Sequence, residues 1–277
     1  MASEKSTDLF SQVLPYASLS NAIYADLKAV KRVAEENNLE VELLETIPGI
    51  EISYAVLKQQ SKNWKIIVIR GTANAENAAV DMDFKLVPDE LSGISIHQGF
   101  KEATTPIFQK LKTRLKKNEK IITTGHSLGG AAALVLAMQL QAQGFNIDRV
   151  ITFGQPKVTN ITGSNKFSDL KVVRVVVPKD PVPVVPPLDP IDINNINIYW
   201  HSGKEIILLG NNKFAVLEGV KAMMRGGEFL TVVPDQINIE SHYMQSYLTE
   251  IKNNSIKVSQ IDYKLSVNFG RLFGFGD

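Results

Sequence analysis

One short segment places a serine between glycines at a change of predicted secondary structure. The segment Gly-His-Ser-Leu-Gly-Gly, residues 125–130, follows an apolar β-type run and precedes a run rich in alanine and leucine. On a strand-to-helix turn of this form the serine backbone is strained and its hydroxyl is lifted above the sheet edge. The helix that follows directs its N-terminal N–H groups at the same place, where they favour a developing negative charge. We therefore expect Ser127 to be a nucleophile for acyl transfer, the alternative being a serine that simply caps a helix.

The glycines on either side of Ser127 have a steric role in this interpretation. A side chain at Gly125 or Gly129 would collide with the neighbouring strand or helix, because the turn is tight. Both positions are glycine in this sequence.

A serine hydroxyl needs a base, and the sequence contains four histidines. His126 is next to the serine but is expected to project away from its hydroxyl, and His97 precedes the serine, which is the wrong order for this type of turn. His201 lies in a strand-like segment, where a packed or surface histidine is the ordinary interpretation. His242 lies where a polar loop runs into a predicted helix, a place that can present a base. His242 is therefore the favoured base, and His201 is the alternative.

The acid that orients the base is expected just past the end of a strand between the serine and the histidine. Asp180 follows the apolar run 171–177 directly, whereas Asp169 precedes that run. Asp189 and Asp192 lie in the next loop and stay open as second choices. An aspartate in this role fixes the imidazole tautomer and stabilises the imidazolium. A loop aspartate can equally be a turn or cap residue.

Strand-like and helix-like segments alternate along the chain, which favours a mainly parallel sheet with helices on both faces. Strands are expected at residues 51–58, 64–70, 149–154 and 171–177, and helices at residues 19–38 and 100–118. The proline-rich segment 178–190 is expected to be a loop, because proline cannot donate to a sheet ladder. We see no internal repeat and no linker, so residues 1–277 are expected to form one α/β domain.

The composition limits the function classes. Lys and Arg number 30 against 29 Asp and Glu, without a run of like charges, so a nucleic-acid partner is not expected. The absence of Cys excludes disulfides and thiolate metal sites, and we expect no metal or cofactor. Residues 1–10 carry charges where a secretory signal would be apolar, and no run is long enough to span a membrane. The chain is therefore expected to be cytoplasmic, or a mature or recloned form of a secreted protein, and its oligomeric state is left open.

Short motifs follow one another in an order that resembles one known family. They are RGT (70–72), HQGF (97–100), GHSLGG (125–130), FGQP (153–156), DPVPVVPP (180–187), YWHSGKE (199–205) and SHY (241–243). Together they extend over most of residues 50–245 and resemble the class 3 lipases, which have an α/β-hydrolase fold. The segments 211–235 and 253–277 match nothing in that pattern, and 253–277 is treated as an unassigned extension.

The resemblance implies roles for individual residues. Ser127, Asp180 and His242 would form a catalytic triad, and the backbone N–H groups of Thr72 and Leu128 would form the oxyanion hole. Residues 73–88 would form a lid over the site. Asp81, with Asp83 as the alternative, would orient the oxyanion hydroxyl of Thr72.

The same resemblance implies a lipase or carboxylesterase that cleaves acylglycerols or related lipid esters and makes transient contact with lipid. A phospholipase- or galactolipase-type acyl hydrolase is one alternative, and a non-catalytic lipid-binding module on the same scaffold is another. The lid segment is rich in alanine, with Met82 and Phe84 as its bulky members before Leu86, so weak interfacial activation is expected. The apolar residues of 214–233 are predicted to form a core-packing helix, with an acyl pocket as the alternative.

Overall fold

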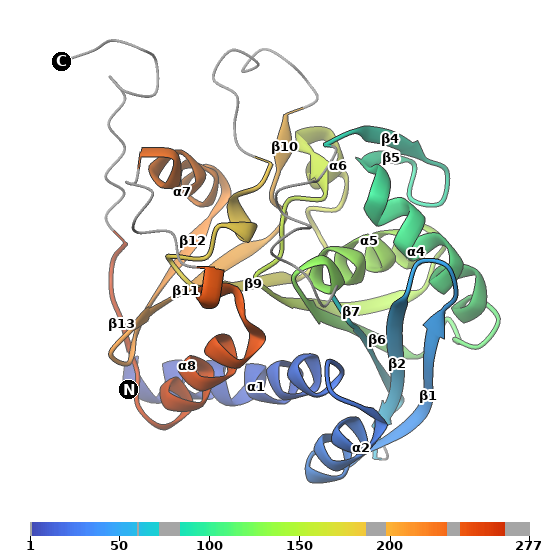
Figure 1. The fold of residues 1–277 in the computed structure, drawn as a ribbon, viewed down its shortest axis with the longest axis horizontal. Coiled ribbons are helices and arrows are strands. Elements are labelled where there is room, and N and C mark those ends of the chain that lie inside the picture. The colour runs from blue at the N-terminus through green and yellow to red at the C-terminus, as the bar shows by residue number, and fades with distance from the viewer. Residues whose placement is uncertain (1, 60, 72–83, 187–197, 232–238, 264–277) are drawn as a thin grey trace.

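The fold is taken from a computed structural model that describes residues 2–59, 61–71, 84–186, 198–231 and 239–263. In these residues one sheet has nine strands in the order β1-β2-β3-β6-β7-β9-β11-β12-β13, and a second sheet has four in the order β10-β8-β5-β4 (Figure 1).

The strands are β1 (Leu39–Ile47), β2 (Ile52–Gln59), β3 (Trp64–Ile69), β4 (Leu86–Asp89), β5 (Ile94–His97), β6 (Lys120–His126), β7 (Asn146–Phe153), β8 (Thr159–Asn160), β9 (Val172–Val176), β10 (Tyr199–Trp200), β11 (Lys204–Gly210), β12 (Lys213–Glu218) and β13 (Ser259–Gln260). The α-helices are α1 (Ala2–Ala22), α2 (Leu27–Glu36), α4 (Gln98–Leu111), α5 (Leu128–Ala142), α6 (Ile161–Lys166), α7 (Gly219–Thr231) and α8 (Met244–Ile256), and the 3₁₀ turns are η1 (Val182–Val184) and η4 (Ile239–His242).

The middle of the large sheet is parallel. The pairs β3–β6, β6–β7, β7–β9 and β9–β11 all run in the same direction. This confirms the predicted fold class, a mainly parallel sheet with helices. The carboxyl ends of these strands lie at one edge of the sheet, so the loops that follow β3, β6, β7 and β9 come together there.

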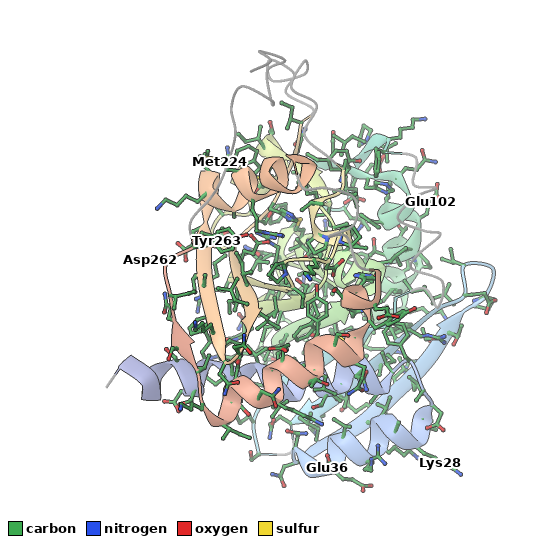
Figure 2. All side chains as sticks on the ribbon, turned by 60° about the vertical axis from the view of Figure 1, so that its left-hand side comes forward. Lys28, Glu36, Glu102, Met224, Asp262 and Tyr263 are labelled. Carbon is green, nitrogen blue, oxygen red and sulfur yellow. The ribbon has the colours of Figure 1, made fainter. Side chains whose placement is uncertain are left out.

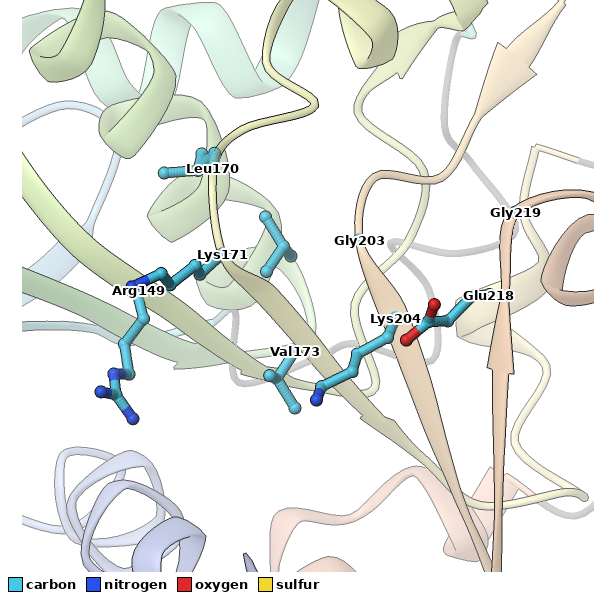
Figure 3. A pocket seen from close by; sticks show the side chains of 9 residues that line it. Arg149, Leu170, Lys171, Val173, Gly203, Lys204, Glu218 and Gly219 are labelled. Carbon is cyan, nitrogen blue, oxygen red and sulfur yellow. The ribbon is translucent and has the colours of Figure 1, made fainter.

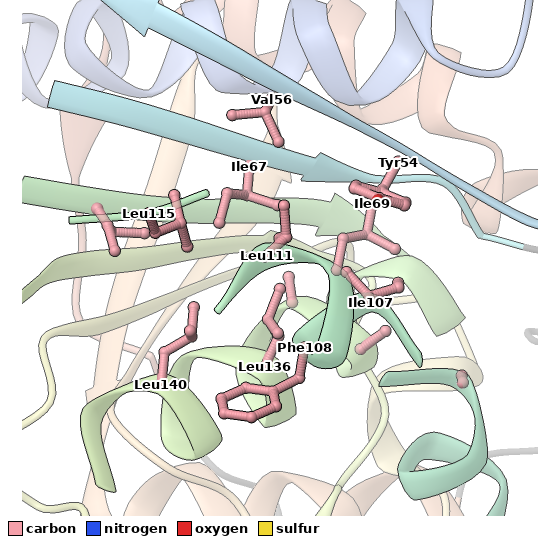
Figure 4. Close-up of a cluster of buried hydrophobic side chains, with 14 of the residues drawn as sticks. Tyr54, Val56, Ile67, Ile69, Ile107, Phe108, Leu111, Leu115, Leu136 and Leu140 are labelled. Atoms are coloured by element: carbon pink, nitrogen blue, oxygen red, sulfur yellow. The ribbon is translucent and has the colours of Figure 1, made fainter. Parts of the chain in front are cut away.

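Helices cover both faces of this sheet, and one side of the core is shown in Figure 4. On that side Ile67 and Ile69 of β3 share a buried cluster with Ile107 and Leu111 of α4 and with Leu136 of α5. On the opposite face, α1 and α8 lie side by side (Figures 1 and 2). A β-branched strand such as β3 suits this position, because a central parallel strand is buried on both faces.

The predicted single helix over residues 19–38 is wrong, because the structure divides this segment between α1 and α2. Asp26 is extended (φ −158°) and its side chain accepts a hydrogen bond of 2.8 Å from the N–H of Ala29. An aspartate in this position stabilises a new helix start, so a break here costs little. The prediction of one helix was based on the spacing of the apolar residues and did not include the helix cap at Asp26.

The new helix α2 is amphipathic. Val30 and Val33 are buried, while Lys28 and Glu36 are exposed and lie at the outer margin of the molecule (Figure 2).

Residues 213–218 form strand β12, so the predicted core-packing helix over 214–233 is wrong in its first part. A two-residue turn, Asn211 and Asn212, joins β11 to β12 with φ values of 50° and 57°. Asparagine tolerates this left-handed conformation, which two-residue hairpins need. The predicted helix over 100–118 starts two residues earlier and ends sooner, as α4.

Two further segments differ from their expected forms. Residues 86–88, at the end of the predicted lid, belong to β4, which pairs with β5. Residues 253–256 complete α8, and the β13 strand that follows pairs with β12, so part of the unassigned extension belongs to the fold.

Candidate active site

Ser127 lies at the junction of β6 and α5 in a strained backbone conformation. Its φ of 58° and ψ of −131° lie outside the regions that side chains favour. Its N–H donates a hydrogen bond of 2.9 Å to the carbonyl of Phe153 on the neighbouring strand. This turn has the shape expected from the sequence.

The glycines beside Ser127 are required by close backbone contacts. A Cβ atom added to Gly125 would lie 2.4 Å from the carbonyl oxygen of Gly129, and one added to Gly129 would lie 2.3 Å from the carbonyl oxygen of Ile69. The prediction that both flanks need glycine is confirmed. The start of α5 therefore lies directly against the end of β3.

The structure brings Ser127, His242 and Asp180 together although they are far apart in sequence. Oγ of Ser127 lies 2.8 Å from Nε2 of His242, and Nδ1 of His242 lies 2.8 Å from Oδ2 of Asp180. The carboxylate can only accept, so Nδ1 carries the imidazole proton and Nε2 is free to accept the hydroxyl proton. This tautomer is the one a general base requires.

Asp180 is fixed by two further donors. It is fully buried just beyond β9, where the N–H of Val182 donates to its Oδ1 over 2.9 Å. The hydroxyl of Tyr247, on α8, donates to its Oδ2. Burial, and then the nearby carboxylate, raises the pKa of Tyr247 well above its usual value, so the phenol stays protonated and remains a donor. Tyr247 was missed in the sequence, where nothing shows that it faces Asp180.

The other histidines have different partners. Nδ1 of His126 lies 2.9 Å from the hydroxyl of Tyr24, and its Nε2 lies 2.6 Å from the carbonyl oxygen of His242, so its ring is turned away from Ser127 as expected. Nε2 of His201 lies 2.7 Å from the carbonyl oxygen of Pro183, and the residue is buried between β10 and β11 rather than inside a strand.

His97 caps α4, where its Nδ1 accepts a hydrogen bond from Gly99. Asp169 is exposed and accepts a hydrogen bond from Gln141, so it takes no part in the group around Ser127.

The expected oxyanion donors are placed only in part. Leu128 is the first residue of α5, so its N–H belongs to the helix turn whose N–H groups have no intrahelical acceptor. Thr72, Asp81 and the alternative Asp83 lie outside the described residues, as do Asp189, Asp192 and residues 73–83 of the predicted lid. Gly71, directly before Thr72, lies against the start of α5, where an added Cβ would be 3.4 Å from the N–H nitrogen of Gly129.

A buried group of charges supports the loop that follows Asp180. Nζ of Lys157 donates to the carbonyl of Val184 over 2.8 Å and also to that of Pro186. Burial lowers the pKa of Lys157 to about 7. Close by, Oε1 of Glu205 accepts two hydrogen bonds from Arg225, at 3.0 and 2.6 Å, and lies 3.5 Å from Nη1 of Arg174.

A separate cleft of about 490 Å³ lies at the opposite edge of the sheet (Figure 3). Its lining includes Lys171 and Lys204, at the start of β9 and β11, together with Glu218. Ser127, Asp180 and His242 lie beyond the other ends of the strands, so this cleft is distinct from the site around Ser127. In the part of the chain that the structure describes, no helix combines the length and apolarity that crossing a membrane requires.

Comparison with known proteins agrees with the resemblance in sequence. The family described as Lipase (class 3) matches residues 66–189. Secreted mono- and diacylglycerol lipase 1 of Fusarium solani is 33% identical over 132 residues, which cover 44% of this chain and 39% of that protein. The chain thus spans about two fifths of the length of this curated relative.

Solved structures agree with the fold. The native complex of Rhizomucor miehei lipase with its propeptide has a TM-score of 0.68 at 21% identity, over 86% of this chain and 80% of that chain. A triacylglycerol lipase whose catalytic centre is described as a serine protease triad has a TM-score of 0.63 at 22% identity, over 85% of this chain and 92% of that chain.

Proposed function

We propose that the chain is a serine carboxylic-ester hydrolase of the class 3 lipase type, which residues 66–189 match, and that it cleaves acylglycerols or related lipid esters. The observation that carries the proposal is the hydrogen-bonded series Ser127–His242–Asp180, with both distances at 2.8 Å, on a strained strand-to-helix turn. The name of the Fusarium solani relative supports mono- and diacylglycerols as substrates.

The geometry supports a two-step reaction. Oγ of Ser127 attacks the ester carbonyl carbon while Nε2 of His242 takes the hydroxyl proton. The imidazolium, stabilised by Asp180, then gives that proton to the leaving alkoxide as the carbon–oxygen bond breaks, and an acyl-enzyme remains. Water, deprotonated by the same imidazole, attacks the acyl carbon and releases the carboxylic acid, and the proton returns to Oγ.

In both steps the negative charge on the carbonyl oxygen needs donors. The N–H of Leu128 and that of Thr72 are the groups we assign to this oxyanion hole, with Asp81 orienting the Thr72 hydroxyl. One such donor is worth on the order of 10² to 10³ in rate. A Thr72→Val variant, which keeps the backbone N–H, tests whether the hydroxyl also contributes.

The decisive experiment measures turnover and covalent labelling together. Wild-type protein should hydrolyse a chromogenic short-chain ester, and a fluorophosphonate should add one label to the peptide that contains Ser127. Ser127→Ala should abolish both. Turnover without labelling at this serine would refute the assignment of the nucleophile, and neither turnover nor labelling would favour a non-catalytic lipid-binding module.

The two histidines provide a matched comparison. His242→Ala should lower turnover by on the order of 10⁴ to 10⁶, because members of a triad act as a unit. His201→Ala should leave most of the turnover per folded molecule, and a reversed outcome would move the base to His201.

Substrate class is tested with a panel of esters. Hydrolysis of phospholipid or galactolipid in preference to acylglycerol would favour the alternative acyl hydrolases. We also propose that the part of the predicted lid that precedes β4, residues 73–85, acts as a lid with weak interfacial activation. The rate on tributyrin should then rise smoothly through the concentration at which an emulsion forms, and a sharp increase at that point would refute weak activation.

A further inference from the structure

The hydroxyl of Tyr24 connects two parts of the site around Ser127. Tyr24 lies in the turn between α1 and α2, outside the segment that matches the family. Its Oη packs closely against Gly71, where an added Cβ would lie 2.3 Å from it, and it lies 2.9 Å from Nδ1 of His126. Nε2 of His126 lies 2.6 Å from the carbonyl oxygen of His242. Tyr24 and His126 therefore connect Gly71 to His242 through one close contact and two hydrogen bonds.

The donor and the acceptor of each hydrogen bond in this series can be assigned. The carbonyl of His242 can only accept, so Nε2 of His126 carries its proton. Burial lowers the pKa of His126 well below its usual value, so the imidazole is neutral and Nδ1 is an acceptor. The hydroxyl of Tyr24 must then donate to Nδ1. The donor and the acceptor of both hydrogen bonds are thus defined.

Both ends of the series are places where a small displacement affects catalysis. Gly71 directly precedes Thr72, the assigned oxyanion donor, and His242 carries the assigned base. The ring of His126 also lies against that of His242, with centroids 4.6 Å apart. We propose that Tyr24 is a positioning residue that holds Gly71 and the His242 backbone at a fixed separation through its hydroxyl. This inference rests on the proposed hydrolase function.

The turn that carries Tyr24 is ordered independently of this hydroxyl. The N–H of Tyr24 donates to the carbonyl of Asn21 over 3.2 Å, and the N–H of Ala25 donates to that of Ala22 over 3.0 Å. The guanidinium of Arg70 lies over the Tyr24 ring, 5.8 Å from its centre. A phenylalanine would keep these ring and backbone contacts, so Tyr24→Phe removes the hydroxyl alone.

The test compares Tyr24→Phe with Tyr16→Phe, a second partly buried tyrosine, which lies on the helix α1 before this turn. Tyr24→Phe should lower kcat on a soluble ester by about 10- to 100-fold, the scale of an ångström-sized misplacement, with KM little changed because the hydroxyl does not face the substrate. Tyr16→Phe should keep the wild-type kcat. The rate of fluorophosphonate labelling at Ser127 should fall in parallel with kcat.

Rates are expressed per serine that can finally be labelled, which removes any contribution from unfolded protein. His126→Phe breaks the same series at its next link and should give the same fall in kcat at unchanged KM. A wild-type kcat in Tyr24→Phe or in His126→Phe, with only the melting temperature lowered, would overturn the inference. Wild-type protein that neither turns over esters nor becomes labelled would instead refute the proposed function.

Discussion

Gly154 gives the sharpest test of how closely His242 and Asp180 are packed. It follows β7 with φ at +56°, and a Cβ atom added there would lie 3.0 Å from Oδ2 of Asp180 and 3.1 Å from Nδ1 of His242. These contacts are tighter than Cβ atoms normally make, so Gly154→Ala must move this hydrogen-bonded pair by a few tenths of an ångström. The site has little room for such a shift.

The expected effect on catalysis follows from that displacement. Catalytic groups must be held within about 0.5 Å of their productive positions, and an error of 1 Å costs on the order of 10²-fold. We therefore expect Gly154→Ala to lower kcat by up to about 10-fold, measured on a soluble ester at saturating concentration. The left-handed backbone should cost a further 1–2 kcal/mol or so of folding free energy, because alanine disfavours positive φ.

Gly219 offers a matched control. Its φ is also +56°, but an added Cβ would meet nothing within 4 Å. Gly219→Ala should therefore lose a similar folding free energy in urea titrations and keep the wild-type kcat. Equal kcat values for the two variants would refute the close packing at Gly154.

Other predictions follow from groups around the site. Tyr247→Phe should lower kcat several-fold at unchanged KM in steady-state assays, because Asp180 loses one of its donors and with it some control of its position. The pKa of Lys157 is about 7 in the folded chain and near 10.5 in the unfolded chain. At a pH between these two values, Lys157 is protonated in the unfolded chain and neutral in the folded chain, so the unfolded state binds more protons. The free energy of unfolding should then rise with pH from 7 to 10 by up to about 1.4 kcal/mol per unit, and Lys157→Met should remove that slope in urea titrations. Glu205→Gln leaves two buried arginines without a counter-charge and should cost about 3–5 kcal/mol in the same measurement.

The fold class could be predicted because its signals are local. The run before Ser127 and the run after it have the composition of a buried strand and a buried helix, and the turn between them needs glycines that the sequence displays. The break at Asp26 and the asparagine turn at 211–212 were missed, because they depend on single cap and turn residues inside segments whose apolar spacing favours another element.

The residues of the candidate site that lie in recognisable motifs could be predicted from the sequence. His242 and Asp180 were chosen by their order along the chain and by resemblance, and the structure places both beside Ser127. Tyr24 and Tyr247 were missed for a different reason. Each acts through one hydroxyl, and the partner of that hydroxyl is set by how α1 and α8 pack on the sheet, which no local pattern encodes.

The packing of α1 beside α8 has a consequence for the order in which the protein matures. Phe10 is fully buried in a cluster that includes Phe214 and side chains of α8, and these partners are synthesised some two hundred residues later. Contacts with such separation form late in folding, since a long loop must close first. During synthesis the apolar side of α1 is therefore exposed until these partners are made. Holdase chaperones bind exposed apolar surfaces of this kind. Ribosome-bound chains halted before residue 244 should bind such a chaperone and lack esterase activity. After release of the complete chain, the chaperone should dissociate and esterase activity should appear.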